Sequence, residues 1–324
     1  MITRKVLINK FVNFVTKGFE LSQAINDEYK TIKKFKKDRN NAKEKKHTAN
    51  SLNKEKFLII GAGNMGIAVL KSLFNHRISS KKIVVIEKNQ SGELKKLKRS
   101  NNFEIKKSID KINNLYQPTI TLIAVKPNQL KTLNGLDKDD KLGNSIVVSV
   151  VAGKKIKDLN KVFKKTSGIV RAMTNTPVSV NMGTTIVCFE RKIKTKQKKP
   201  IFDFLSLLGQ VSETKKEDLI DDFTAIFGSG PAYIYLFINS LIEIANKSGF
   251  KNSDSMVLQT FLGSILLLLS GQKKPSDLQK KVTSKGGTTE AALSILASNK
   301  GLKSLLTRAV NKATKRSREL SKIS

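Results

Sequence analysis

The chain has 324 residues, with 61 Lys and Arg against 26 Asp and Glu and a formal net charge of +35. This length suits two domains of about 150 residues each and excludes a small fold held together by disulfides. The single cysteine, Cys188, excludes an intramolecular disulfide and indicates a reducing compartment, so we expect a cytoplasmic protein with no metal site. The only histidines, His47 and His76, are not placed for a His-centred catalytic site.

The high positive charge taken alone suggests a polyanion as partner. The lysines are scattered along the whole chain, however, and no basic run carries interleaved aromatic residues for base stacking. We therefore expect no nucleic-acid partner, although a nucleic-acid-binding protein on a dinucleotide-binding scaffold stays open as an alternative of another class. The longest apolar run, within residues 261–270, falls far below the roughly 20 residues of a membrane span, so we expect no membrane partner.

Residues 1–56 differ in composition from the rest of the chain. They carry lysine runs such as the one at 33–37 and few large apolar side chains after Phe19, which favours a basic, flexible N-terminal extension with a weak amphipathic helix. A targeting peptide is the alternative, because basic and apolar residues are interleaved near the start. Acidic residues are out of place in such a peptide, and this segment contains Glu20, Asp27 and Glu28.

Residues 57–213 alternate short apolar runs with polar helical stretches. The runs are rich in β-branched residues and apolar throughout, which suits strands buried on both faces of a parallel sheet. They occupy residues 57–60, 83–86, 120–125 and 145–150. The pattern predicts an α/β fold whose N-terminal domain is Rossmann-like, with a parallel sheet covered by helices.

A glycine loop follows the first predicted strand. It has the form G-x-G-x-x-G and leads directly into an apolar helix; its residues are Gly61, Ala62, Gly63, Asn64, Met65 and Gly66. The first glycine allows a tight turn, the second a close approach of the backbone to a pyrophosphate, and the third close packing of helix on strand. The free N–H groups of the helix start can then bind phosphate. We interpret this loop as a dinucleotide-binding site.

Three further strand ends should lie beside the cofactor, because ligands of an open parallel sheet bind beyond the carboxyl ends of its strands. Glu87 ends the second strand about 20 residues beyond Gly66, where a carboxylate accepts hydrogen bonds from an adenosine ribose and favours NADH. Lys88, next to it, is placed to accept the 2′-phosphate of NADPH. The other candidate contacts are Ala124, Val125, Lys126 and Pro127, and Val150, Val151 and Ala152.

Residues 214–324 read as an all-α domain. Helical patterns cover residues 233–248, 253–270, 276–281 and 290–320, and strand signals are absent from the sequence there. Residues 222–235 contain no lysine that could act as the base of a hydroxyacid dehydrogenase. Reduction of a protonated C=N bond fits better, since an iminium carbon is already electrophilic and needs mainly alignment with a hydride.

Five segments in this order and spacing resemble pyrroline-5-carboxylate reductase. They are residues 61–66, Ala124–Pro127, Arg171–Pro177, Gly228–Tyr233 and Ser284–Thr289, and the resemblance extends from about Lys56 to Leu320. It implies reduction of 1-pyrroline-5-carboxylate to L-proline by NADPH or NADH, the last step of proline biosynthesis. It also implies a homodimer or higher homo-oligomer through the helical domain. A reductase of another cyclic imino acid is the alternative within the same class.

The resemblance also implies the substrate site. The family's substrate contacts map onto Glu217, Thr224, Ser284, Gly287, Thr288 and Thr289, and Thr224 is the candidate catalytic hydroxyl beside the ring nitrogen. At the start of a predicted helix, the backbone of Thr288 and Thr289 can bind the substrate carboxylate, together with the Ser284 and Thr289 hydroxyls. Lys285 stands where the family usually has proline, so we expect a less rigid loop without loss of a backbone donor.

Overall fold

The computed structural model describes residues 51–133, 141–271 and 274–321. Its contacts divide the chain into two compact units. We call the first the sheet unit; its described part comprises residues 51–133, 141–237 and 299–321. The second, the helical unit, has residues 238–271 and 274–298 as its described part. Most of residues 1–56 lie outside the described residues, but the end of this segment belongs to the sheet unit, since Leu52 is fully buried and Ser51 Oγ donates to Asp203 at 2.7 Å.

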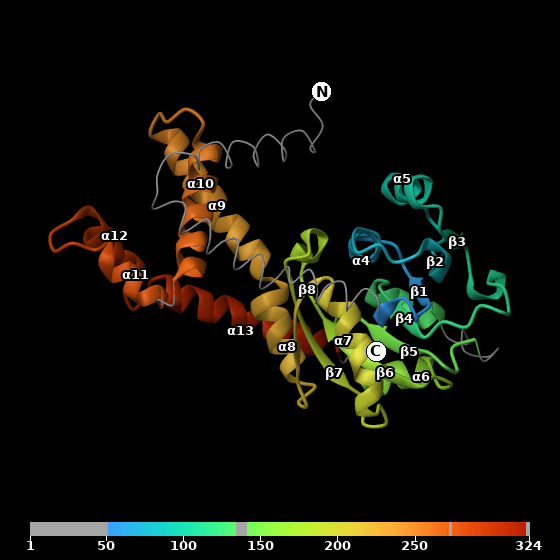
Figure 1. Ribbon diagram of the computed structural model, residues 1–324. Helices are drawn as coiled ribbons and strands as arrows, with labels where there is room; N and C mark the ends of the chain where they lie inside the picture. Colours follow the sequence, from blue (N-terminus) through green and yellow to red (C-terminus); the bar gives the residue numbers. More distant parts are fainter. Residues whose placement is uncertain (1–50, 134–140, 272–273, 322–324) are drawn as a thin grey trace. The chain divides into compact units, whose positions relative to one another are not determined.

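An eight-stranded sheet forms the centre of the sheet unit (Figure 1). Its strand order is β3-β2-β1-β4-β5-β6-β7-β8. The strands from β3 to β6 run parallel, while β7 is antiparallel to β6 and β8 is parallel to β7. The strands are β1 (Phe57–Ile60), β2 (Ile83–Ile86), β3 (Glu104–Lys106), β4 (Ile120–Ile123), β5 (Ile146–Ser149), β6 (Gly168–Met173), β7 (Gly183–Phe189) and β8 (Gly209–Glu213).

Both faces of the sheet are covered, as the apolar runs predict. Alternate side chains of a strand point to opposite faces. In β1, Phe57 and Ile59 belong to one buried cluster and Leu58 and Ile60 to another. The first cluster includes side chains of α4 (Asn64–Asn75), α5 (Gly92–Asn101) and α7 (Thr195–Ser206), the second those of α6 (Ile156–Val162) and the 3-10 turn η3 (Pro127–Leu133). The predicted α/β sheet is therefore confirmed, with one antiparallel strand pair that the prediction lacked.

Helices follow the last strand, as predicted. The sheet unit holds α8 (Leu219–Phe223), a π-helical turn η5 (Thr224–Gly228), the start of α9 (Gly230–Lys247) and α13 (Leu302–Leu320). The helical unit holds the rest of α9, α10 (Ser253–Ser270), α11 (Pro275–Lys281) and α12 (Thr288–Leu296). The pattern predicted over 290–320 is two helices, because the turn-forming residues between Ser298 and Gly301 separate α12 from α13.

The long helices leave much apolar surface uncovered. Two stretches, Leu219–Lys247 and Ser253–Ser270, are long and apolar enough to cross a membrane by length and composition, and in each only 6% of the most apolar 18 residues are buried. The length of the longest uninterrupted apolar run in the sequence does not identify these stretches as candidate spans, because single polar residues interrupt them. Exposed apolar surface of this extent marks a face that binds another protein or a membrane.

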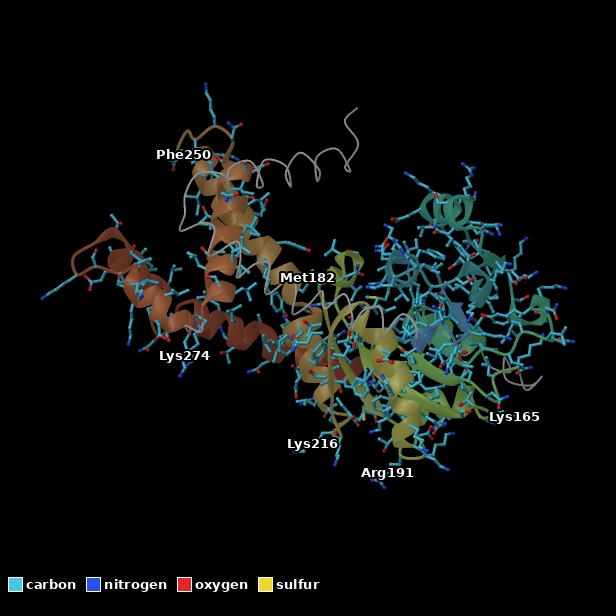
Figure 2. The ribbon with its side chains drawn as sticks, viewed as in Figure 1. Lys165, Met182, Arg191, Lys216, Phe250 and Lys274 are labelled. Atoms are coloured by element: carbon cyan, nitrogen blue, oxygen red, sulfur yellow. The ribbon has the colours of Figure 1, made fainter. Side chains whose placement is uncertain are left out.

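The basic side chains do not gather on one face: Lys165, Arg191 and Lys216 project from separate segments of the sheet unit (Figure 2).

Candidate functional site

The glycine loop lies between β1 and α4 and packs tightly against β4. A Cβ on Gly61, whose φ is +94°, would lie 2.7 Å from the Ala124 carbonyl oxygen, and one on Gly66 only 2.1 Å from the Gly61 carbonyl oxygen. Side chains at these two positions are therefore excluded by backbone. Gly63 differs, because a Cβ there would meet no atom within 4 Å. The open side of Gly63 fits the close approach of a pyrophosphate.

The start of α4 fits an anion. Gly63 is its N-cap residue, and no side chain caps this helix end. The N–H groups of a first helical turn lack intrahelical acceptors, and they carry the positive end of the helix dipole. The loop therefore presents unsatisfied donors beside the open space at Gly63, which is the arrangement that binds the phosphates of a dinucleotide.

Glu87 follows β2 directly, and its carboxylate braces the glycine loop. One carboxylate oxygen accepts a hydrogen bond from Ala62 N at 2.8 Å and the other accepts one from Asn89 N at 2.9 Å. The Lys88 side chain beside it is exposed. The predicted ribose-binding acid thus contacts the predicted phosphate-binding loop within the sheet unit.

The ends of β4 and β5 lie at the same edge of the sheet. Ala124 N donates to Ile60 O at 2.8 Å, and Val150 N donates to Ile123 O at 3.1 Å. Val151 is buried, whereas the Lys126 side chain is exposed and its backbone N–H donates to Gln129 Oε1 at 3.1 Å. The predicted cofactor residues therefore all lie at the carboxyl ends of four neighbouring strands, β2, β1, β4 and β5. Their contact with a cofactor stays a prediction.

Glu217 lies just before α8 and joins it to the start of α6, directly after the β5 loop. Its Oε1 atom accepts a hydrogen bond from Ile156 N at 2.7 Å and lies 3.5 Å from Arg171 Nη1. Beside it, Lys155 Nζ donates to Asp218 at 2.7 Å, which raises the lysine pKa and lowers that of the Asp218 carboxyl. The loop after Val150–Ala152 is thereby joined to the segment that carries the predicted substrate residues.

Thr224 begins the π-helical turn between α8 and α9 and is partly buried. Its hydroxyl donates to Ile220 O at 2.7 Å, so the lone pairs of the oxygen stay available to accept a hydrogen bond. Single π-helical turns are rare and frequent at functional sites. Asn175, which follows β6, secures the turn: its amide donates to Phe227 O at 3.1 Å and accepts from Thr184 N at 3.0 Å. Sequence reasoning gave Asn175 no role, although it follows a strand at the same end as the cofactor residues.

The second glycine loop belongs to the helical unit and leads into α12, as predicted. Gly286 has a φ of +73° and its N–H donates to Glu290 Oε2 at 2.7 Å, while Gly287 N donates to Ser284 O at 3.0 Å. Glu290 was missed from the sequence, although a glutamate in the first turn of a helix commonly bonds backwards to the preceding loop. The donors of the first α12 turn start at Thr288 and have no capping side chain.

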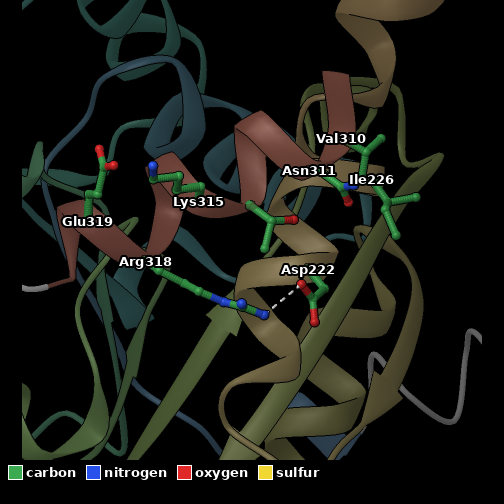
Figure 3. A pocket seen from close by; sticks show the side chains of 8 residues that line it. Asp222, Ile226, Val310, Asn311, Lys315, Arg318 and Glu319 are labelled. Atoms are coloured by element: carbon green, nitrogen blue, oxygen red, sulfur yellow. Dashed lines mark hydrogen bonds and ion pairs between the residues drawn. The ribbon is translucent and has the colours of Figure 1, made fainter. Parts of the chain in front are cut away.

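A groove lies in the sheet unit between α13 and the α8–η5 segment, with a volume of about 710 Å³ (Figure 3). Asp222 and Arg318 form an ion pair at 3.1 Å within it, beside Ile226 and Val310. The lining contains none of the predicted site residues, which all lie in the described part of the chain. The strand ends, and not this groove, define the candidate cofactor site.

Two protein families match the sequence. The family "Pyrroline-5-carboxylate reductase dimerisation" matches residues 217–320, and "NADP oxidoreductase coenzyme F420-dependent" matches residues 56–153. The pyrroline-5-carboxylate reductase of Synechocystis sp. is 30% identical over 267 residues, which is 82% of this chain and 97% of the relative. That of Aquifex aeolicus is 30% identical over 264 residues, 81% of this chain and 96% of the relative.

Solved structures give the same result. The pyrroline carboxylate reductase of Plasmodium falciparum, solved with NADP bound, has a TM-score of 0.72 and 28% identity, and the match covers 82% of this chain and 98% of that one. The pyrroline-5-carboxylate reductase of Coxiella burnetii has a TM-score of 0.73 and 30% identity, with the same coverage. The similarity thus extends through both the sheet and the helices.

Proposed function

The chain belongs to the pyrroline-5-carboxylate reductase family, and we propose that it reduces the C=N bond of 1-pyrroline-5-carboxylate to give L-proline, with NADPH or NADH as hydride donor. This reaction is the last step of proline biosynthesis. The observation that carries the proposal is the sheet edge where Gly61–Gly66, Glu87 and the ends of β4 and β5 meet, since a dinucleotide binds at such an edge.

The residues at this edge fit a nicotinamide dinucleotide. The open space at Gly63 and the uncapped start of α4 would hold the pyrophosphate, and Glu87 would accept hydrogen bonds from the adenosine ribose. A carboxylate repels a 2′-phosphate, so Glu87 favours NADH, whereas Lys88 would attract that phosphate. We propose a preference for NADH, because Glu87 is held in place by two backbone donors and the Lys88 side chain is exposed.

The bound nicotinamide supplies the hydride. Thr224 acts as a hydrogen-bond acceptor in this proposal, because its own hydroxyl proton is donated to Ile220 O. The hydroxyl oxygen can therefore accept a hydrogen bond from the N–H of a protonated imine and hold the ring in one orientation. Glu217, partly exposed at the start of the same segment, adds negative charge that favours the protonated imine.

We propose that the second glycine loop binds the substrate carboxylate. The N–H groups of Thr288 and Thr289 in the first α12 turn and the hydroxyls of Ser284 and Thr289 are suitable donors for this anion. Gly287 keeps the loop compact, since a Cβ there would lie 2.4 Å from Ser284 Oγ. Glu290 takes the N–H of Gly286, which leaves the donors of the helix start for the substrate.

The dimerisation family match over residues 217–320 supports a homo-oligomer, which would cover the exposed apolar faces of α9 and α10. We propose that these faces bind a second copy of the chain and not a membrane or nucleic acid. Ile234, Leu236 and Leu267 are among the exposed residues, and burial of such side chains stabilises association. The single cysteine supports the cytoplasm as location.

The test uses the purified full-length protein with 1-pyrroline-5-carboxylate and either NADH or NADPH. We expect substrate-dependent loss of the absorbance of reduced nicotinamide, with a higher kcat/KM for NADH, and L-proline as product. No loss with either cofactor would overturn the proposal. A six-membered cyclic imino acid serves as the control substrate, and we expect it to react about 10 to 200 times less efficiently, the range for one methylene.

Substitution of Thr224 tests its role. Thr224→Val keeps the shape but removes the acceptor, so we expect a fall in kcat of about 10²-fold or more, of the size typical for a lost catalytic hydrogen-bonding group. The dissociation constant for NADH, measured by fluorescence titration, should change less than twofold. Thr224→Ser is the matched control and should retain most of the turnover. Wild-type turnover in Thr224→Val would contradict the assignment.

A further inference from the structure

Arg171 is the largest fully buried side chain of the sheet unit, with 1% exposure, and it lies in the middle of β6. Its guanidinium faces two carboxylates from the α8 segment: Nη2 lies 3.0 Å from Asp221 Oδ1 and Nη1 lies 3.5 Å from Glu217 Oε1. Ser317 Oγ of α13 donates to the same Asp221 oxygen at 3.0 Å. Strand β6, α8 and α13 therefore meet in one buried polar cluster.

This cluster is a costly way to hold a helix. Buried charges lose their hydration, and well-packed apolar side chains of similar volume commonly give equal or greater stability. In addition, Arg171 Nε is buried without a hydrogen-bond partner among the described residues. The advantage of the arrangement lies in its geometry. A rigid guanidinium fork that contacts Asp221 within α8 and Glu217 just before it fixes both the rotation of α8 and its position along its axis.

The position of α8 determines that of the proposed catalytic hydroxyl. Ile220, the residue before Asp221, provides the carbonyl that accepts the Thr224 hydroxyl proton. Glu217, the other contact of the guanidinium, also accepts from Ile156 N at the start of α6, directly after the β5 loop. Arg171 thus acts on Glu217 directly and on Thr224 through the α8 backbone.

We propose that Arg171 is a positioning residue for the reduction, acting through Glu217 and Asp221 to set the place of Thr224 relative to the strand ends. This inference rests on the proposed function. The chain supplies a matched control, because α8 carries two adjacent aspartates. Asp221 is buried with Arg171, whereas Asp222 pairs with Arg318 at 3.1 Å on an exposed face.

The experiment compares Asp221→Asn with Asp222→Asn. For Asp221→Asn we expect kcat/KM for 1-pyrroline-5-carboxylate to fall at least tenfold, mostly in kcat, while the NADH dissociation constant stays within twofold. For Asp222→Asn both should stay within twofold of wild type. If folded Asp221→Asn, assayed well below its unfolding temperature, has the wild-type kcat/KM, the cluster is merely structural and the inference is overturned.

Ser317→Ala provides a milder second variant in case Asp221→Asn does not fold. It removes one donor to Asp221, and we expect a two- to fivefold fall in kcat with unchanged NADH binding; no change in kcat would count against the inference. Hydrogen exchange of residues 217–229 needs no turnover and separates this inference from the proposed function. Exchange should be faster in Ser317→Ala than in Asp222→Asn. Equal exchange in the two variants would overturn the positioning role even if the wild type reduced no imine.

Discussion

The two glycine loops place glycine for different physical reasons. In the first, Gly61 and Gly66 are enclosed by backbone atoms of the loop itself and of the β4 end. In the second, Gly286 has open space around it but a left-handed φ of +73°, and Gly287 is close only to Ser284, through its hydroxyl and its carbonyl oxygen. The first loop is determined by the packing of strands and helix, and the second by its own backbone conformation.

The two loops also differ in the contacts that support them. The first loop is held by β1, β4 and the carboxylate after β2, so its shape depends on the whole sheet unit. The second is held by Glu290 and by the Ser284 carbonyl, all within a few residues. A change at an enclosed position of the first should affect stability and cofactor binding together, whereas a change in the second should affect mainly the substrate.

Gly66→Ala should have the largest effect. The new methyl carbon would lie 2.1 Å from the Gly61 carbonyl oxygen, so the backbone must move. Overpacking of this kind typically costs about 1–3 kcal/mol, and the displaced loop should no longer bind cofactor. We expect a lower unfolding temperature and no saturable NADH binding in a fluorescence titration. Wild-type stability together with wild-type binding would show that the loop is not packed as described.

Gly63→Ala should separate binding from stability at the same loop. Gly63 has an ordinary φ of −70°, and the added methyl group meets no atom within 4 Å. We expect the free energy of unfolding to change by less than about 1 kcal/mol. The NADH dissociation constant should rise at least tenfold, about 1.4 kcal/mol, because the methyl group lies where the pyrophosphate approaches. Gly92→Ala, at the equally open start of α5, is the control and should bind NADH normally.

Gly286→Ala should affect the second loop alone. A left-handed conformation costs a non-glycine residue roughly 1–2 kcal/mol, so the loop should shift and kcat/KM for the imine should fall about tenfold. NADH binding should be unchanged. Gly249 has a φ of +86° and equally open surroundings in the helical unit. Gly249→Ala should therefore lose similar stability in thermal unfolding but keep its kcat/KM, and an equal loss of activity in both variants would rule out a specific role for the second loop.

The sequence was sufficient for the parts of the fold that depend on local pattern. The runs at 57–60 and 83–86 coincide with β1 and β2, since short β-branched segments buried on both faces have few alternatives. Strand direction is not local, and the antiparallel β6–β7 pair could not be predicted. The break between α12 and α13 could have been, because Ser298, Asn299 and Gly301 are turn-forming residues.

The candidate site likewise contains residues that the local sequence pattern predicts and residues that only tertiary packing shows. The cofactor residues follow strands, so their meeting at one edge follows from a parallel sheet. Arg171 shows the limit: an arginine inside a strand is ordinarily exposed, and its carboxylate partners lie 46 and 50 residues later in the chain. Only tertiary packing shows that it is buried. Thr224 was assigned by resemblance, and neither its bond to Ile220 nor the π-helical turn follows from residue pattern.

The smallest effect should come from the ion pair between Lys155 and Asp218, which joins the β5 loop to the start of α8. Removing it tests how far the contact between this loop and α8 depends on exposed ion pairs. The hydrogen bond from Lys155 lowers the pKa of Asp218 and raises that of Lys155. Asp218 therefore stabilises the fold above its unfolded pKa of about 3.9, and this contribution is lost as the pH falls through its lower folded pKa. The Lys155 contribution is complete below its unfolded pKa of about 10.4 and is lost as the pH rises through its raised folded pKa. Because the Asp218 side chain is 78% exposed, solvent screening limits the pair to about 0.2–1 kcal/mol.

Asp218→Asn should thus lower the free energy of unfolding by that amount at pH 7 and by less at pH 3, measured by urea denaturation. A pH-independent difference would mean that Asp218 acts through packing and that the buried contacts of Glu217 and Arg171 alone support this part of the site.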